Sequence, residues 1–235
     1  MAEVIVALDA ASASDAERLL ERLPDVRWVK VGSVLMTREG SELVRRFVAR
    51  GLRVFLDLKW HDIPNTVAGA VRGARDLGVA MATVHTLGGR RMMEAAAEAA
   101  GNGIAMVGVT VLTSHDPASY ASATGRHPAP LDGEVRRLAE SARDAGLSGI
   151  VCSPLELGTV RQVLGGSALI VVPGIRRAAD AGDDQVRTAA PRDAVAGGAT
   201  HLVVGRPITA ALDPAAAFRG VVEEAGAAVA GRFES

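Results

Sequence analysis

The sequence predicts an α/β protein, a single (β/α)8 TIM barrel that spans residues 1–235. Eight short apolar runs recur along the chain, helix-length amphipathic segments separate most of them, and a chain of 235 residues suits one such barrel. The runs are continuous rather than alternating, as expected of parallel strands that are covered on both faces. A doubly wound open sheet is the alternative, but no Gly-x-Gly-x-x-Gly pattern follows the first run.

The predicted strands and helices follow from these apolar runs and from the residues that bound the segments between them. The strands are expected at residues 4–9, 28–32, 53–59, 81–86, 105–113, 149–153, 169–175 and 201–206. A helix is predicted from Ser14, a favourable N-cap residue, and another from Glu134, with a glycine stop. Two connections are unusually long, 114–132 and 176–190, and long loops at the catalytic face of a barrel often act as lids.

Composition and charge exclude several classes of protein. With 49% apolar and 23% charged residues the chain can bury a core, and its formal net charge of −1 does not indicate binding to nucleic acid or to an anionic membrane. No signal peptide is apparent, and glycines and polar residues interrupt the uncharged run 99–115, so we expect no membrane span and a cytoplasmic location. The single cysteine, Cys152, is expected to be a buried thiol without a disulfide within the chain.

Lysine is unusually rare in this chain. Of the 26 basic residues only Lys30 and Lys59 are lysines, and the others are arginines. Both lysines fall at the ends of apolar runs. We interpret them as groups that arginine cannot replace, either as a compact ammonium or as a proton donor.

Polar residues gather at the carboxyl ends of the predicted strands, where a barrel builds its active site. Asp57 and Lys59 are two residues apart, so they are expected on one face of the third strand, with Leu58 on the other. Asp62 follows on the loop. The other strands contribute a similar set of residues: Asp9, Lys30, Thr113, Gly205 and Arg206. Ionisable groups that converge from several strands indicate a functional site.

The last two predicted strands indicate a phosphate site. Gly205 lets the backbone approach a ligand closely, Arg206 follows it, and the loops after strands seven and eight form the recurrent phosphate site of such barrels. Arg176 and Gln185, on the long loop after strand seven, are placed to close over the same phosphate. The roles of His61 and His85 stay open, and no metal-ligand spacing predicts a metal site.

Residues 54–67, VFLDLKWHDIPNTV, resemble the signature of the orotidine 5′-phosphate decarboxylase family. The resemblance extends along nearly the whole chain through VALD, VKVG, VHTLGG, VTVLTS, VVPGIR, AGDDQVR and VVGRPIT. Trp60 stands where the family often has phenylalanine. The shorter Asp-x-Lys-x-x-Asp pattern also resembles Mg²⁺-dependent hexulose-phosphate synthases and keto-gulonate-phosphate decarboxylases, but the continuation IPNT at 63–66 favours the orotidylate enzyme.

The resemblance implies that the chain converts orotidine 5′-monophosphate (OMP) to UMP and CO₂, the last step of de novo pyrimidine biosynthesis, without cofactor or metal. Lys59 would protonate C6 of the pyrimidine, Asp57 would face the substrate carboxylate, and Lys30 would bind Asp57 and the ribose. A homodimer with shared active sites is implied, in which Asp62, Ile63 and Thr66 reach the neighbouring site. The implied substrate-binding residues are Asp9, Lys30, Asp62, Ile63, Thr66, Thr113, Pro173, Arg176, Gln185, Gly205 and Arg206.

The chemistry explains why charges would be clustered in this way. Loss of CO₂ leaves an electron pair on a ring carbon with no conventional electron sink, so stabilisation must come from preorganised charge in a dry pocket. An ammonium beside that carbon is stabilising, and neighbouring carboxylates disfavour the carboxylate of the substrate. Two alternatives remain at this stage: a Mg²⁺-dependent sugar-phosphate lyase on the same barrel, which EDTA would inactivate, and a non-catalytic nucleotide-binding barrel.

Overall fold

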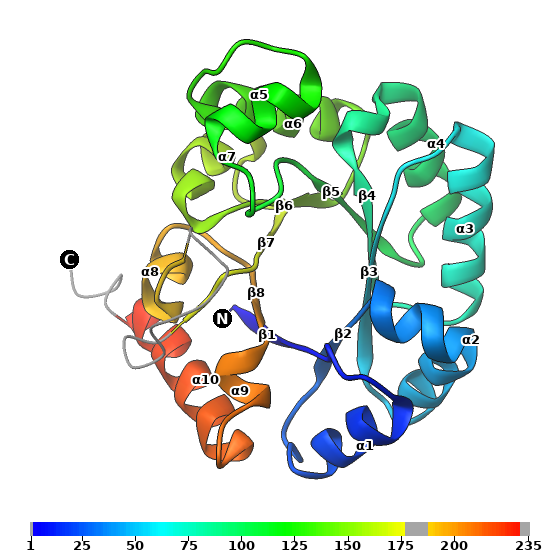
Figure 1. Ribbon diagram of the computed structural model, residues 1–235, viewed down its shortest axis with the longest axis vertical. Coiled ribbons are helices and arrows are strands. Elements are labelled where there is room, and N and C mark those ends of the chain that lie inside the picture. Colours follow the sequence, from blue (N-terminus) through cyan, green and yellow to red (C-terminus); the bar gives the residue numbers. More distant parts are fainter. Residues whose placement is uncertain (1, 177–187, 231–235) are drawn as a thin grey trace.

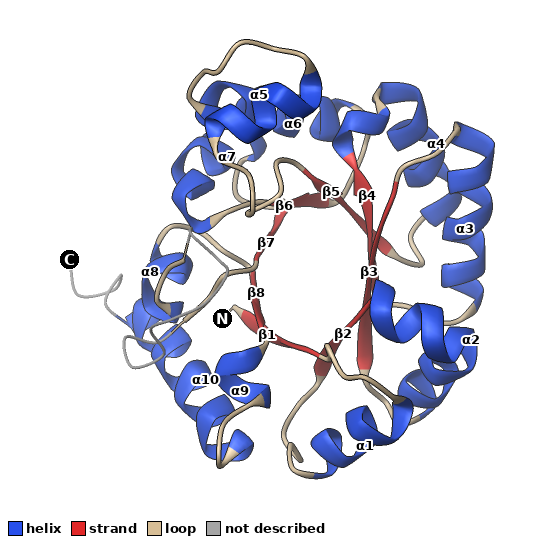
Figure 2. Cartoon of the chain, in the orientation of Figure 1, coloured by secondary structure: helices blue, strands red, loops and turns tan. Residues whose placement is uncertain are grey.

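Eight parallel strands form a closed barrel in the order β1 to β8, and helices surround it (Figure 1). The structure is a computed structural model, and it describes residues 2–176 and 188–230. Figure 2 shows the strands as an inner ring and the helices as an outer layer. The predicted (β/α)8 barrel is confirmed. Among the helices described, none is both long and apolar enough to cross a membrane.

Each observed strand begins inside or just before a predicted run. The strands are β1 (Glu3–Ala7), β2 (Trp28–Gly32), β3 (Arg53–Trp60), β4 (Met81–His85), β5 (Ala105–Val109), β6 (Gly149–Val151), β7 (Leu169–Val172) and β8 (His201–Val204). Several strands end earlier than predicted. The apolar runs extend beyond the strand ends because the residues there are buried as well: Leu8 is 1% exposed and Val111 2%. Asp9 and Thr113 therefore lie on loops that follow strands, and Arg206 begins a helix.

The helices, with two short 3₁₀ turns, connect the strands. They are α1 (Ala13–Glu21), α2 (Ser33–Ala49), α3 (Pro64–Asp76), η1 (Thr86–Gly88), α4 (Arg90–Ala100), α5 (Pro117–Thr124), α6 (Leu131–Asp144), η2 (Pro154–Glu156), α7 (Leu157–Leu164), α8 (Pro191–Ala196), α9 (Arg206–Thr209) and α10 (Pro214–Ala230).

Two predicted helix starts were wrong, by two and by three residues. The N-cap of α1 is Ser12 rather than Ser14, because the Ser12 side chain accepts a hydrogen bond from the Asp15 N–H. Helix α6 begins at Leu131, before Glu134, which places both Asp132 and Glu134 in its first turn. Negative charges there interact favourably with the helix dipole, so the earlier start is the stable one.

The predicted long connection at 114–132 contains helix α5 and is firmly anchored. Glu134 of α6 accepts hydrogen bonds from the Tyr120 hydroxyl at 2.7 Å and from Arg126 and Arg137 at 2.6 Å. The hydrogen bond from Arg137, with further contacts to Tyr120 and Arg126, lowers the pKa of Glu134 to about 2. This segment is a helix tied to its neighbour rather than an unstructured loop. The other long connection, 176–190, lies largely outside the described residues.

Two apolar layers hold the barrel together. One cluster lies between the strands and the helices, and a second fills the barrel interior: Ile5, Ala7, Trp28, Phe55, Met81, Val107, Val171 and Val203. The interior is therefore a packed core rather than a pore. Its upper members, among them Ala7, Phe55 and Val203, also line the cavity at the carboxyl ends of the strands. The core thus provides the apolar floor of that cavity.

The amino-terminal end of the barrel is closed by an aromatic group. The ring of Trp28 packs edge-on against His201 with centroids 5.2 Å apart, and the Arg53 guanidinium carbon lies 4.4 Å from the centre of the indole ring. Burial, assisted by the positive charge of Arg53, lowers the pKa of His201 to about 4. His201 is therefore neutral in the folded protein near neutral pH.

We expect the His201→Gln variant to lose part of the pH dependence of stability. An ordinary histidine has a pKa of 6.5, so protonation of His201 favours unfolding. Neutral His201 contributes its full stabilisation at pH values above 6.5, the pKa in the unfolded chain. This stabilisation is lost as the pH falls from there toward about 4, the pKa in the folded protein. Between about pH 7.5 and about pH 5, the free energy of unfolding should fall by about 2 kcal/mol less in the variant than in the wild type. Urea unfolding at both pH values measures this, and identical pH dependence would contradict the assignment.

Candidate active site

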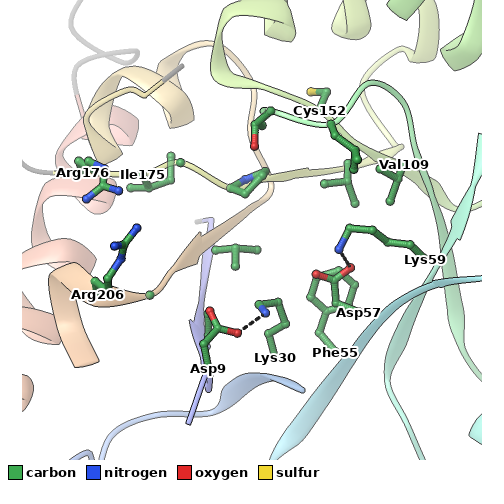
Figure 3. Close-up of a pocket in the computed structure, with 18 of the residues that line it drawn as sticks. Asp9, Lys30, Phe55, Asp57, Lys59, Val109, Cys152, Ile175, Arg176 and Arg206 are labelled. Carbon is green, nitrogen blue, oxygen red and sulfur yellow. Dashed lines mark hydrogen bonds and ion pairs between the residues drawn. The ribbon is translucent and has the colours of Figure 1, made fainter. Parts of the chain in front are cut away.

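A cavity of about 270 Å³ opens at the carboxyl ends of the strands (Figure 3). It brings together these predicted residues: Asp9, Lys30, Asp57, Lys59, Thr113, Pro173, Arg176, Gly205 and Arg206. They come from β2 and β3 and from the segments that follow β1, β5, β7 and β8. Both lysines of the chain are among them. The predicted convergence of polar residues at one rim of the barrel is observed.

Asp57 and Lys59 form an ion pair, with Lys59 Nζ 2.9 Å from Asp57 Oδ1. The Asp57 side chain is 15% exposed and that of Lys59 39%, so the carboxylate is the more buried partner. Both line the cavity, whereas Leu58 faces a separate groove between α2 and α3. The expected division of these three side chains between two faces is observed.

The end of β3 departs from regular strand geometry at Lys59. Its φ of 51° makes it the one non-glycine residue with positive φ in the described part of the chain. An L-residue in this left-handed conformation costs about 1–2 kcal/mol. The pairing of β3 with β4 also changes register here, from Leu56 opposite Ala82 to Trp60 opposite Val84. Strained backbone of this kind is concentrated at functional sites.

Thr83 of β4 is a site residue that sequence reasoning missed. It is fully buried, its hydroxyl accepts a hydrogen bond from Lys59 N at 2.8 Å, and it donates one to Asp57 Oδ1 at 3.2 Å. The only available signal was a polar residue within the apolar run MATVH at 81–85. That signal is weak, because buried threonines are also common in strands without any function.

Lys30 is paired with Asp9 rather than with Asp57. Its Nζ lies 2.8 Å from Asp9 Oδ1, and no ion pair joins it to Asp57 in the described structure. Strand register offers Lys30 two carboxylates, because Lys30 lies opposite Ala7 on β1 and opposite Phe55 on β3. Asp9 and Asp57 each follow those partners by two residues. Lys30 therefore has a carboxylate on either side, and it contacts the one from β1.

The two arginines and the Asp57–Lys59 pair occupy opposite ends of the cavity (Figure 3). Arg176 and Arg206 lie at one end, and the Asp9–Lys30 pair lies between the two ends. Gly205 lies beside Asp9, where an added Cβ would be 3.8 Å from Asp9 Oδ2. Four cationic and two anionic side chains line the cavity, so its surplus of positive charge suits an anionic ligand. Gln185 lies outside the described residues.

Asp62, Ile63 and Thr66 do not line the cavity of their own chain. They follow β3 at the start of α3 and are exposed, Ile63 by 66%. The Asp62 side chain accepts a hydrogen bond from the Ile63 N–H at 2.6 Å. These three predicted residues therefore form an exposed rim beside the cavity, which we call the α3 rim.

His85 and His61 lie next to this rim, with stacked rings whose centroids are 5.6 Å apart. Burial, followed by the charges of His61 and Lys59, lowers the pKa of His85 to about 4. His85 Nδ1 accepts a hydrogen bond from the Leu87 N–H at 3.3 Å, which caps η1. His85 is therefore a neutral histidine that supports the turn after β4.

Two further predictions concern cysteine and metal. Cys152 is 1% exposed, as expected for a buried thiol, and it borders the cavity. Among residues 2–176 and 188–230, no group of three or more His, Cys, Asp or Glu side chains is arranged to hold a metal ion.

Comparison with known proteins identifies the family. A sequence model of the orotidine 5′-phosphate decarboxylase / HUMPS family matches residues 2–221. The chain belongs to this family. It is 53% identical over 229 residues to orotidine 5′-phosphate decarboxylase from Halorhodospira halophila, with 96% of each chain covered. The corresponding enzyme from Alkalilimnicola ehrlichii is 51% identical over 225 residues, covering 94% of this chain and 95% of the relative.

The fold of this family is also seen in crystal structures. The orotidine 5′-phosphate decarboxylase of Lactobacillus acidophilus superposes with a TM-score of 0.86 at 35% identity, covering 96% of this chain and 99% of that one. An uncharacterized conserved protein from Geobacillus kaustophilus gives a TM-score of 0.82 at 36% identity, covering 94% and 99%. The family resemblance predicted from residues 54–67 is confirmed over nearly the whole chain.

Proposed function

We propose that this chain decarboxylates OMP to UMP and CO₂, with residues 1–235 acting as one catalytic domain. One combination of observations carries the proposal. The chain is about half identical to curated orotidine 5′-phosphate decarboxylases, and its cavity holds an Asp57–Lys59 ion pair at one end and two arginines at the other. OMP has a carboxylate on its pyrimidine and a phosphate on its ribose, so it matches this distribution of charge.

Lys59 is the proposed proton donor. The bond between C6 and the carboxylate carbon breaks, CO₂ leaves, and the electron pair stays on C6. The Lys59 ammonium then transfers a proton to C6 and later regains one from solvent. Its charge stabilises the transition state more than the ground state, because negative charge at C6 develops only as the bond breaks.

Asp57 and the apolar floor complete the proposed electrostatic arrangement. The Asp57 carboxylate faces the substrate carboxylate, and repulsion between the two disfavours the bound ground state until CO₂ is lost. The floor contains Phe55, Val109 and Val203, which exclude water. In such surroundings charges interact more strongly than in water.

The rest of the cavity binds the ribose and phosphate. Asp9 and Lys30 are proposed to contact the ribose, and Thr113 and Pro173 to border the pyrimidine. Arg176, Gly205 and Arg206 are proposed to hold the phosphate, together with Gln185. Binding energy from the phosphate offsets the cost of bringing like charges together at the reacting end.

A homodimer with shared sites is proposed to complete the charged array. Asp62, Ile63 and Thr66 of the α3 rim are exposed and absent from the cavity of their own chain. This position supports their proposed role in the partner's site.

The activity itself is tested by following the loss of orotidylate ultraviolet absorbance with purified protein. Protein treated with EDTA should remain fully active, because the proposed mechanism uses only protein side chains. Loss of turnover that Mg²⁺ restores would instead favour a metal-dependent sugar-phosphate lyase. Tight UMP binding without any turnover would favour a nucleotide-binding barrel.

Lys59→Ala should abolish turnover while UMP binding persists. Loss of a general acid costs about 10²-fold or more in kcat. Steady-state kinetics and calorimetric titration with UMP measure the two effects. A variant that keeps more than about a tenth of the wild-type kcat would remove Lys59 as the proton donor.

Arg206→Ala should mainly raise the KM for OMP. The lost contact is a charge-assisted hydrogen bond worth about 1.5–3 kcal/mol, and kcat should fall less than KM rises. The Lys59→Ala variant provides the contrast, because its defect lies in kcat. An unchanged KM would contradict the phosphate assignment.

Subunit mixing tests the shared site. Lys59→Ala chains and Asp62→Ala chains, each with low activity alone, are mixed and allowed to exchange. If Asp62 serves the partner, each mixed dimer has one intact site and one doubly altered site. Activity should then return to about a quarter of the wild-type value, since about half the dimers are mixed. Absence of recovery despite verified exchange would place Asp62 in its own chain's site.

A further inference from the structure

Thr83 occupies an unusual place in the barrel, opposite the irregular end of β3. Between the pairs Leu56–Ala82 and Trp60–Val84, β3 contains three residues, whereas β4 contains only Thr83. One residue of β4 cannot form regular backbone hydrogen bonds with three residues of β3. Here the Thr83 hydroxyl, rather than a backbone carbonyl of β4, accepts the hydrogen bond from Lys59 N.

The hydrogen bonds around Thr83 form a closed ring. Lys59 N donates to Thr83 Oγ1 at 2.8 Å, Thr83 Oγ1 donates to Asp57 Oδ1 at 3.2 Å, and Lys59 Nζ donates to the same Oδ1 at 2.9 Å. A hydroxyl has a single proton, and the backbone N–H can only donate. The direction of every bond is therefore fixed, and the Thr83 proton must point to Asp57.

We propose that Thr83 is a positioning residue that fixes the Lys59 ammonium and the Asp57 carboxylate relative to each other for the reaction. This inference rests on the proposed function. Thr83 is fully buried and does not line the cavity, so it acts through the other two residues. Its hydroxyl accepts a hydrogen bond from the backbone N–H of Lys59, whose backbone is in a left-handed conformation, and donates one to the Asp57 carboxylate.

The threonine hydroxyl makes two contacts, and it shares the second, with Asp57 Oδ1, with the Lys59 ammonium. It accepts a hydrogen bond from the Lys59 N–H, which the register shift leaves without a partner in the regular pairing of β3 with β4. It also restricts the rotation of the Asp57 carboxylate by donating to one of its oxygens. Water cannot take its place without a cavity, because Thr83 is 0% exposed. A valine of the same shape would leave the Lys59 N–H without this acceptor and Asp57 Oδ1 with one donor fewer, so that both residues are held less firmly.

The test compares Thr83→Val, which removes the hydroxyl and keeps the shape, with Thr83→Ser, which keeps the hydroxyl. Thr200→Val is a matched control. The Thr200 hydroxyl also accepts a main-chain hydrogen bond, from Ile170 N at 2.9 Å, but it precedes β8 at the opposite end of the barrel. Urea unfolding verifies that Thr83→Val and Thr200→Val are folded under assay conditions.

In Thr83→Val, kcat for OMP should fall about 10- to 100-fold, since a misplaced catalytic group costs up to about 10²-fold. UMP affinity and KM should stay within about twofold, because the groups proposed to bind phosphate and ribose are untouched. Thr83→Ser should retain kcat within about threefold of wild type, and Thr200→Val should match wild type. A purely structural role would lower stability in both valine variants without separating kcat from KM.

A second readout does not depend on catalysis. Because Lys30 and Lys59 are the only lysines, competitive amine labelling followed by peptide mass spectrometry reports on each one separately. Labelling of Lys59 should rise about threefold or more in Thr83→Val, as its hydrogen bond to Asp57 loosens, while Lys30 stays as in wild type.

The outcomes separate the two proposals. Wild-type protein without decarboxylase activity would refute the proposed function, and labelling would still decide whether Thr83 holds Lys59. Unchanged kcat together with unchanged Lys59 labelling in Thr83→Val would overturn the positioning role. An equal loss of kcat in the serine and valine variants would overturn it as well, because the hydroxyl would then not be the cause.

Discussion

The ion pair between Asp57 and Lys59 is the interaction around which the rest of the cavity is arranged. It lies where β3 loses its regular pairing with β4, and Lys59 adopts a left-handed backbone conformation there. Such a conformation persists only where the surrounding structure compensates its cost. The compensation comes from Thr83 and from closure of the barrel, which fixes β4 against β3. The charged pair therefore depends on the whole sheet.

The register of the first three strands extends this constraint across the cavity. Lys30 lies between Ala7 of β1 and Phe55 of β3, so Asp9, just after β1, and Asp57, on β3, flank it two residues further along the chain. Carboxylates and ammonium groups thus alternate along the rim from β1 to β3. Each of the two lysines has a neighbouring carboxylate, which offsets part of the cost of removing these charges from water.

The two ends of the cavity lie on different parts of the barrel. The reacting end lies on strands and rests on the packed barrel core, so its groups are held by secondary structure. The arginine end lies on segments that follow β7 and β8, and Arg176 N donates to the carbonyl of Ala189 at 3.0 Å. A rigid reacting end suits electrostatic preorganisation, since charges that must move during the reaction stabilise its transition state less.

The sequence alone determined the barrel, the family and most cavity residues, because these depend on local patterns. Continuous apolar runs indicate parallel strands, and strand ends in a barrel meet at one rim, so Asp57, Lys59 and Arg206 were predicted from their positions alone. Element ends were predicted less well. Leu8 and Val111 are buried although they lie beyond the ends of their strands, so the apolar pattern does not mark where the strands end. Two serines, Ser12 and Ser14, lie at the start of the first helix, and the sequence does not show that Ser12 is the N-cap.

Only the tertiary structure decided which partners these groups have. The role of Thr83, the pairing of Lys30 with Asp9 and the left-handed backbone of Lys59 depend on register between strands that are far apart in sequence. A shift of two residues in that register changes every cross-strand partner while keeping the same side chains on each face of the sheet. Composition and spacing therefore specified which residues reach the cavity, and barrel closure specified which of them touch.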